Sequence, residues 1–100
     1  MENPSVDVPS QFSLEQNYPN PFNPATNFQF SIVPALGRDQ LAILKVYDVL
    51  GREVATLVNE EKQPGTYTVE WNASGVASGV YTYRLISGNL VETKKMLLLK

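Results

Sequence analysis

Beyond residue 12, polar and apolar residues alternate along most of the chain, and this two-residue period is typical of strands buried on one face. The clearest case is residues 27–33, which place Phe28, Phe30 and Ile32 on one side. The same pattern predicts further strands at residues 41–47, 53–58, 66–71, 80–86 and 90–99. On residues 66–71 the side chains expected to point inward are Tyr67, Val69 and Trp71, and Trp71 and Tyr81 are expected in the core. Two further strands have one face with Ala42, Leu44 and Val46 and one face with Tyr81, Tyr83 and Leu85. Helical periodicity is nearly absent, so the pattern predicts an all-β domain.

Short turn sequences separate the expected strands. Asp48 suits the first position of one turn because its carboxylate can accept backbone N–H groups, and Gly51 at the end of that turn tolerates a positive φ. The other turn markers are Pro64, Gly65, Gly79 and Gly88. Short strands between such turns predict an immunoglobulin-like β-sandwich of about seven short antiparallel strands. Because the chain has no cysteine to join two sheets, Trp71 and the tyrosines are expected to fill the space of an inter-sheet disulfide.

The chain is predicted to hold one domain and a short linker. Residues 1–11 are polar, contain two prolines and are predicted to be the linker, and residues 12–100 are predicted to form the β-sandwich domain. The first ten residues have neither the basic segment nor the apolar run of a signal peptide, so an export signal is expected elsewhere in the parent protein. No apolar run approaches the ~20 residues that a membrane-spanning helix needs.

The composition excludes several kinds of chemistry. Without cysteine or histidine, the chain lacks thiolate and imidazole metal ligands, a cysteine nucleophile and the commonest general base. A net charge of −2 indicates no basic surface for nucleic acid. Asp48 and Glu53 flank one turn, but a turn cap and a solvated strand residue explain them better than an acid–base pair. We therefore expect no enzyme activity, no cofactor, no metal and no small-molecule substrate.

A proline-rich segment at residues 17–24 stands outside the strand pattern. Its three X-Pro steps predict an extended or polyproline II backbone, which repeats every three residues. One edge then carries Asn17, Asn20 and Asn23, and the other two edges are apolar. We expect the segment to lie along the sandwich, with the asparagines bonding nearby backbone. The alternative is a PxxP ligand for an SH3-type groove, but Pro21, Phe22, Asn23 and Pro24 make a short and weak pattern for it.

The last expected strand is apolar on both faces over residues 96–99. A strand that is buried on one side should show either Met96 and Leu98 or Leu97 and Leu99, but not both pairs. Two alternatives remain open: the strand is covered on both faces, or one pair is exposed. An exposed pair would form a docking strip beside the lysines, and the candidate residues are Lys94, Lys95, Leu97, Leu99 and Lys100.

Four segments occur in order along the chain: residues 17–26 with Asn-Tyr-Pro-Asn-Pro-Phe-Asn-Pro, residues 46–54 with Asp-Val-Leu-Gly-Arg, residues 78–85 with Ser-Gly-Val-Tyr, and residues 93–100 with the lysines and the leucine run. Together they resemble the C-terminal sorting domain of the type IX (Por) secretion system, type A. They are also similar to the immunoglobulin-like module of flagellar hook-capping proteins. The resemblance covers nearly all of residues 12–100.

This resemblance implies a non-catalytic C-terminal secretion signal in a Gram-negative bacterium. Such a domain directs a covalently attached cargo protein from the periplasm to an outer-membrane translocon, and a sortase-like peptidase then removes it, leaving the cargo secreted or on the cell surface. The motif residues are Pro21, Phe22, Asn23, Pro24, Asp48, Gly51, Pro64, Gly65, Tyr67, Trp71, Gly79, Tyr81 and Gly88. The alternative function is an immunoglobulin-like structural or binding accessory module of a secreted enzyme.

Overall fold

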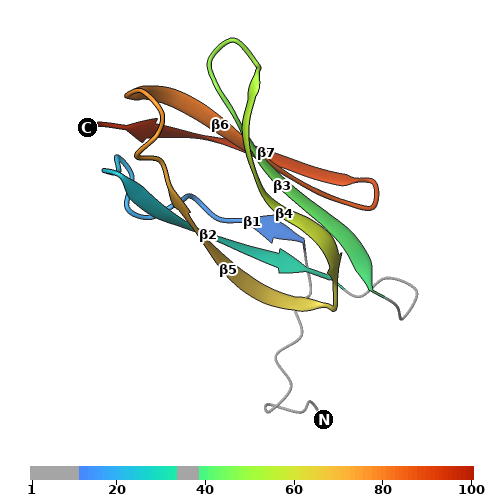
Figure 1. Ribbon diagram of the computed structural model, residues 1–100. Helices are drawn as coiled ribbons and strands as arrows, with labels where there is room; N and C mark the ends of the chain where they lie inside the picture. The colour runs from blue at the N-terminus through green and yellow to red at the C-terminus, as the bar shows by residue number, and fades with distance from the viewer. Residues whose placement is uncertain (1–11, 34–38) are drawn as a thin grey trace.

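The computed structural model describes residues 12–33 and 39–100, which form a sandwich of two antiparallel sheets (Figure 1). Strands β1, β2 and β5 form the first sheet in that order, and the second sheet has the order β4-β3-β6-β7. The bounds are β1 Ser13–Leu14, β2 Ala25–Ile32, β3 Gln40–Tyr47, β4 Glu53–Lys62, β5 Gly65–Asn72, β6 Gly79–Ser87 and β7 Leu90–Leu98. The predicted all-β sandwich of seven strands is confirmed. The expected linker, residues 1–11, lies outside the described residues.

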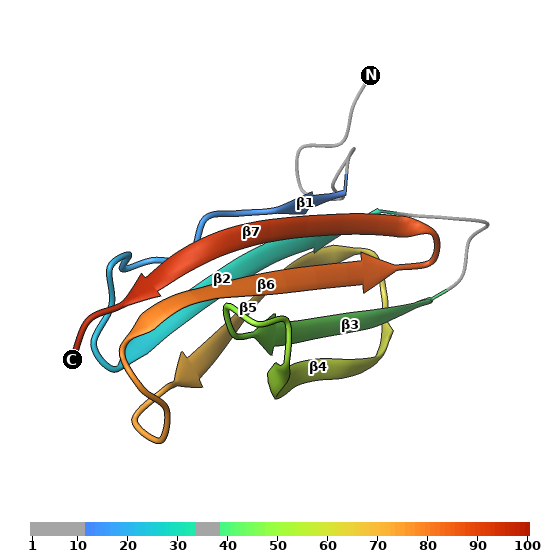
Figure 2. The same ribbon diagram turned by 90° about the horizontal axis from the view of Figure 1, so that it is seen from above.

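The core lies between the two sheets, which Figure 2 shows as stacked layers. The face formed by Phe28, Phe30 and Ile32 on β2, by Ala42, Leu44 and Val46 on β3, and by Tyr81, Tyr83 and Leu85 on β6 is the buried one, and Trp71 of β5, which was expected to point inward, is buried as well. Tyr67 and Val69 are partly buried and pack against the core. The alternation of polar and apolar residues therefore assigned the faces of these strands correctly. It does so because successive side chains of a strand point to opposite sides of its sheet.

Aromatic rings fill the space between the sheets near Trp71. Its ring centroid lies 6.0 Å from that of Phe22 and 6.0 Å from that of Tyr81. Further along the core, the rings of Phe28 and Tyr83 are 4.7 Å apart. The expectation that Trp71 and Tyr81 belong to the core is confirmed. Tilted pairs of this kind are the favoured arrangement because the edge of one ring meets the face of the other.

The proline-rich segment does not have the regular three-residue repeat that its sequence predicted. Phe22 is buried, but Pro19 and Pro21 are exposed, so neither apolar edge faces the core along its length. The segment contains three cis X-Pro peptide bonds. Its backbone forms one bridge to β2, at Tyr18, and a second bridge to β7, at Phe22. The segment thus lies along the sandwich as expected, but the regular repeat was wrong, because the backbone bonds first to one sheet and then to the other.

In the part of the chain that the structure describes, no helix has the length and apolar character needed to cross a membrane.

The first prediction concerns the aromatic core. Replacing Trp71 by alanine should lower the free energy of unfolding by about 3–5 kcal/mol, because it empties a large buried site next to two other rings. Glu70→Ala, on the exposed face of the same strand, should change it by less than about 0.5 kcal/mol. Urea unfolding of both variants measures these values, and a similar small loss in both would contradict the placement of Trp71.

Candidate functional site

The four sequence segments that resemble the sorting domain meet at one end of the sandwich. Tyr47, the last residue of β3, pairs with Thr82 near the start of β6, and Gly79 at that start pairs with Leu98 at the end of β7. In the other sheet, the start of β2 pairs with the end of β5. Figure 1 shows the C-terminus, the start of β2 and the β5–β6 connection close together. We call this region the motif end, comprising residues 17–24, 48–52, 73–78 and 99–100.

A buried tyrosine hydroxyl anchors the segment that leads to the motif end. The Tyr83 hydroxyl donates a hydrogen bond to the Glu15 carbonyl at 2.9 Å and accepts one from the Asn17 N–H at 2.8 Å. The pKa of Tyr83 is raised to about 12, mainly by burial; the bond from the Asn17 N–H acts in the opposite direction, and the nearby charge of Glu15 adds to the increase. Because Tyr83 lies on β6, this one group ties the chain after β1 to the opposite sheet.

The Asn17 side chain organises the turn that follows. It is buried, and its Nδ2 donates to Thr26 Oγ1 at 2.9 Å and to the Pro19 carbonyl at 3.1 Å. Thr26 Oγ1 donates to the same carbonyl at 2.9 Å. Among the described residues, no buried side-chain polar atom lacks a partner. The expectation that asparagines of this segment bond nearby backbone is confirmed here and at Asn20.

The same segment covers the outer edge of β7. The Phe22 N–H donates to the Leu97 carbonyl, the Leu99 N–H donates to the Phe22 carbonyl, and both bonds are 3.0 Å long. Asn20 Oδ1 accepts from the Leu97 N–H at 3.0 Å, and Gln16 Nε2 donates to the Lys95 carbonyl at 2.8 Å. The Lys95 carbonyl, the N–H and carbonyl of Leu97 and the N–H of Leu99, which follows β7, are thus already bonded. The edge is protected against pairing with another strand over this stretch.

This arrangement decides between the two alternatives for the last strand. Met96 and Leu98 point inward and are buried, whereas Leu97 is half-buried and Leu99 is 51% exposed. On the same outer face, Leu97 is paired across the strands with Val80 of β6, which is 46% exposed. Of the second pair only Leu99 is exposed and Leu97 is half-buried, so the second alternative holds for one residue of the pair.

The three lysines of the tail do not form one cluster. Lys94 is half-buried and shares the inward face of β7 with Met96, whereas Lys95 lies on the outer face with Leu97. At the C-terminus, the Lys100 N–H donates to Ser78 Oγ at 2.9 Å and its Nζ donates to the Ser74 carbonyl at 2.7 Å. Lys100 therefore also holds the β5–β6 loop against the tail.

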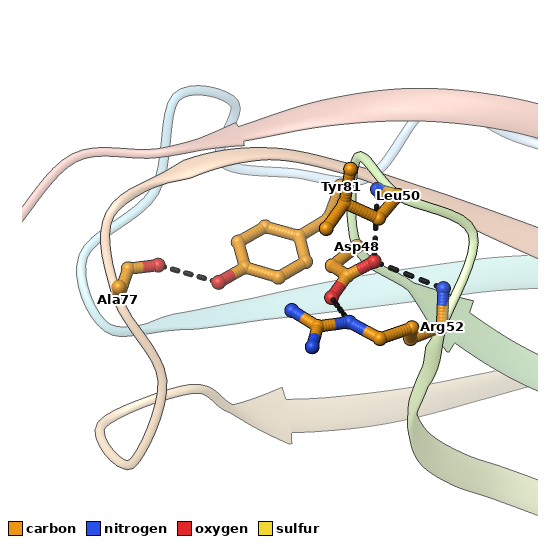
Figure 3. A network of polar contacts seen from close by, with 5 residues as sticks. All are labelled: Asp48, Leu50, Arg52, Ala77 and Tyr81. Carbon is orange, nitrogen blue, oxygen red and sulfur yellow. Dashed lines mark hydrogen bonds and ion pairs between the residues drawn. The ribbon is translucent and has the colours of Figure 1, made fainter.

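Two tyrosines, one near the start of β5 and one near the start of β6, make the same hydrogen bond to a backbone carbonyl. The Tyr67 hydroxyl donates to the Gln63 carbonyl at 2.6 Å, and the Tyr81 hydroxyl donates to the Ala77 carbonyl at 2.5 Å (Figure 3). Each bond reaches four residues upstream, as in the tyrosine corner of β-sandwich domains. The sequence analysis named both tyrosines but missed this shared role, although each follows a glycine at the same spacing.

The turn between β3 and β4 is held by one carboxylate (Figure 3). Asp48 Oδ1 accepts hydrogen bonds from the N–H groups of Leu50 and Arg52, each at 2.9 Å, and Oδ2 accepts one from Arg52 Nε at 2.8 Å. The Arg52 N–H is the main reason why the pKa of Asp48 is lowered. Gly51 has φ 85°, in the left-handed region that favours glycine. The predicted cap and the predicted positive φ are both confirmed.

The carboxylates beside this turn are not poised for acid–base chemistry. Glu53 bonds to Thr56 Oγ1 at 2.7 Å and to Lys45 Nζ at 3.0 Å, and these bonds lower its pKa. A general acid at neutral pH needs a raised pKa, and both Asp48 and Glu53 are shifted the other way. Among the described residues there is also no group of three acidic side chains that could hold a metal ion.

The sequence analysis overlooked the two residues at the tip of this turn. Val49 is 80% exposed and Leu50 is 74% exposed, although both are large and apolar. Their position in the sequence could have indicated this exposure, because two apolar residues at the centre of a tight turn cannot reach the core.

With this geometry in view, comparison with known families gives one result. The model of the secretion system C-terminal sorting domain family matches residues 16–99. The chain belongs to the type IX sorting domain family. Neither a curated protein nor a solved structure matches it. The sorting domain is a secretion signal recognised by the type IX machinery, its family is non-catalytic, and it marks a protein exported to the cell surface or beyond.

The second prediction concerns the anchoring hydroxyl. Tyr83→Phe should lower the free energy of unfolding by about 1–3 kcal/mol, because it leaves the buried N–H of Asn17 without an acceptor. Tyr18→Phe removes a hydroxyl from a side chain that is 79% exposed, and it should have almost no effect. Thermal or urea unfolding compares the two, and an equal response would contradict the anchoring role.

The third prediction is a dependence on alkaline pH. Tyr83 ionises near pH 12 in the folded sorting domain but near its ordinary value of about 10 when unfolded. Between these values the unfolded state binds fewer protons, so stability should fall as the pH rises from about 10 towards 12. The decrease should be smaller in Tyr83→Phe, which lacks this group. Urea unfolding at a series of alkaline pH values measures it, and parallel curves for both proteins would contradict the prediction.

Proposed function

We propose that this sorting domain directs an attached cargo protein through the outer membrane, and that it does so as a folded, non-catalytic recognition module. The observation that carries the proposal is the convergence of the motif segments. They are far apart in the sequence, they lie almost wholly within the span matched by the family, and they meet at one end of the sandwich. A single assembled end is a suitable shape for recognition by export machinery.

The polar groups of the motif end support recognition rather than chemistry. The carboxylate of Asp48, the amide of Asn17 and the hydroxyl of Tyr81 are all bonded within the domain. Such groups hold loops in one conformation, which lowers the entropy lost when a partner binds. What remains for a partner is the shape of this end and its exposed apolar side chains.

The partner-recognition residues that we propose on the tail are Lys94, Lys95, Leu97, Leu99 and Lys100. Leu97 and Leu99 form an apolar strip on the outer face together with Val80, and Lys95 lies on the same face. The proposed partners are a translocon in the outer membrane, which binds the domain, and a sortase-like peptidase, which removes it afterwards. The route runs through the periplasm, with the cargo covalently attached.

An export assay tests this function directly. A fluorescent protein with an N-terminal periplasmic signal is fused to this chain and produced in a bacterium that has the type IX system. We expect fluorescence in the medium or on the cell surface, whereas the same reporter without the domain should stay in the periplasm. Retention of the complete fusion in the periplasm would contradict the proposal and favour an accessory module.

The fourth prediction tests the lysines of the tail. Replacing Lys94, Lys95 and Lys100 together by alanine should leave the domain folded and lower its free energy of unfolding by about 1–3 kcal/mol at most, because Lys95 is an exposed charge, Lys94 is half-buried and Lys100 loses only the bond from its Nζ. Export of the reporter should fall sharply, and the cargo should accumulate in the periplasm.

The matched control removes the same positive charge elsewhere, in Lys45→Ala, Lys62→Ala and Arg84→Ala. Lys45 and Lys62 pair with Glu53 and Glu60, and Arg84 lies over the ring of Tyr47. The control variant should fold and be exported. Normal export of the tail variant would show that its lysines are not recognised, and its unfolding would show that they are structural.

A further inference from the structure

The β3–β4 turn exposes two aliphatic side chains that the fold does not need there. Val49 and Leu50 are 80% and 74% exposed, and neither belongs to the core or to the residues packed against it. The turn itself is specified by Asp48 and Gly51, and polar residues are the usual choice for the positions between. The apolar pair therefore needs an explanation outside the folding of the domain.

This tip is preorganised. The backbone of Asp48 adds two hydrogen bonds to those of its carboxylate. Its carbonyl accepts one from the Gly51 N–H at 3.0 Å, and its N–H donates one to the Arg52 carbonyl at 2.9 Å. The backbone N–H groups of Leu50, Gly51 and Arg52 are all bonded within the turn. Moving the turn out of water would leave none of these three groups unpaired, so the usual penalty for burying backbone is small.

The charges at the tip cancel. Asp48 and Arg52 form an ion pair at 2.8 Å, so the net charge beside the two apolar side chains is zero, although the Arg52 side chain is 74% exposed. An anionic lipid surface would be attracted by unpaired basic residues. A neutral, rigid and apolar tip fits instead into a concave apolar pocket of a protein, where a few desolvated side chains supply most of the affinity.

We propose that the β3–β4 turn is a docking tip, whose Val49 and Leu50 side chains enter an apolar pocket on a protein component of the export machinery. This inference rests on the proposed function and gives it a second contact, apart from the tail. The tip and Leu99 both lie toward the end of the four-stranded sheet where β3 and β7 end, with β6 between these strands.

The test uses the complete chain fused to the exported reporter. In the double variant Val49→Ser with Leu50→Ser, we expect the ratio of exported to periplasmic reporter to fall about tenfold or more, because two apolar anchors are lost. A separate variant, Val49→Ile with Leu50→Met, keeps the tip apolar and should be exported as well as the unchanged chain. Loss of export in this second variant would overturn the proposal.

The matched control is Leu90→Ser with Val91→Ser. These residues are 46% and 55% exposed, and they lie at the opposite end of the sandwich, beside the β6–β7 turn. We expect normal export of this variant, and the same melting temperature for all purified variants within about 2 °C, since changes at exposed positions are small. Equal export of the tip variant and the control variant would overturn the proposal.

The outcomes separate this inference from the proposed function. If the unchanged fusion is not exported, the proposed function fails, and the tip inference fails with it. If the unchanged fusion and the Val49→Ser, Leu50→Ser fusion are exported equally well, only the tip inference fails.

Two other occupants of the tip are examined with the purified chain. Vesicles of phosphatidylethanolamine and phosphatidylglycerol test a lipid surface, and sedimentation velocity tests a second copy of the chain. Binding to vesicles, or self-association, that disappears in Val49→Ser with Leu50→Ser would overturn the proposal of a protein pocket. We expect neither.

Discussion

The arrangement of the motif end depends on the buried hydroxyl of Tyr83. By bonding to both Glu15 and Asn17, it sets the position of the chain after β1 relative to the opposite sheet. From that position the segment can run beside β7, where Asn20 and Phe22 bond to the backbone of the last strand. An edge strand that ends the chain would otherwise expose unpaired backbone groups, a known cause of aggregation. The segment after β1 therefore provides hydrogen-bond partners for the open edge of the second sheet, although β1 itself belongs to the first sheet.

Polar and apolar residues of the motif end have separate tasks. The polar ones are used for the fold: Asp48 closes a turn, Tyr81 fixes the start of β6, and Lys100 joins the tail to the β5–β6 loop. The apolar ones that stay at the surface, among them Leu50 and Leu99, take no part in the core. Fixed polar loops that carry exposed apolar side chains are typical of preorganised binding surfaces.

Aromatic packing stabilises this domain without a disulfide. Trp71 packs against Phe22 and Tyr81, so the proline-rich segment, β5 and β6 meet in one cluster. Burial of large rings supplies stability that a cystine would otherwise provide. The same cluster lies next to the motif end, so the proposed partner surface rests directly on the aromatic core.

The sequence by itself determined six of the seven strands, the alternation of their faces and the turn at Asp48 and Gly51, because these features depend on neighbours a few residues away. It also indicated, through the order of its motifs, which family to expect. It missed β1, ended β4 at Val58 instead of Lys62, left open which face of the last strand is buried, and predicted a regular repeat that the proline-rich segment does not have. Those features were decided only by the tertiary structure: Gln16 and Lys95 are 79 positions apart, and Asn20 and Leu97 are 77 apart. Contacts over such separations follow from how the two sheets pack, and no local pattern of residues records them.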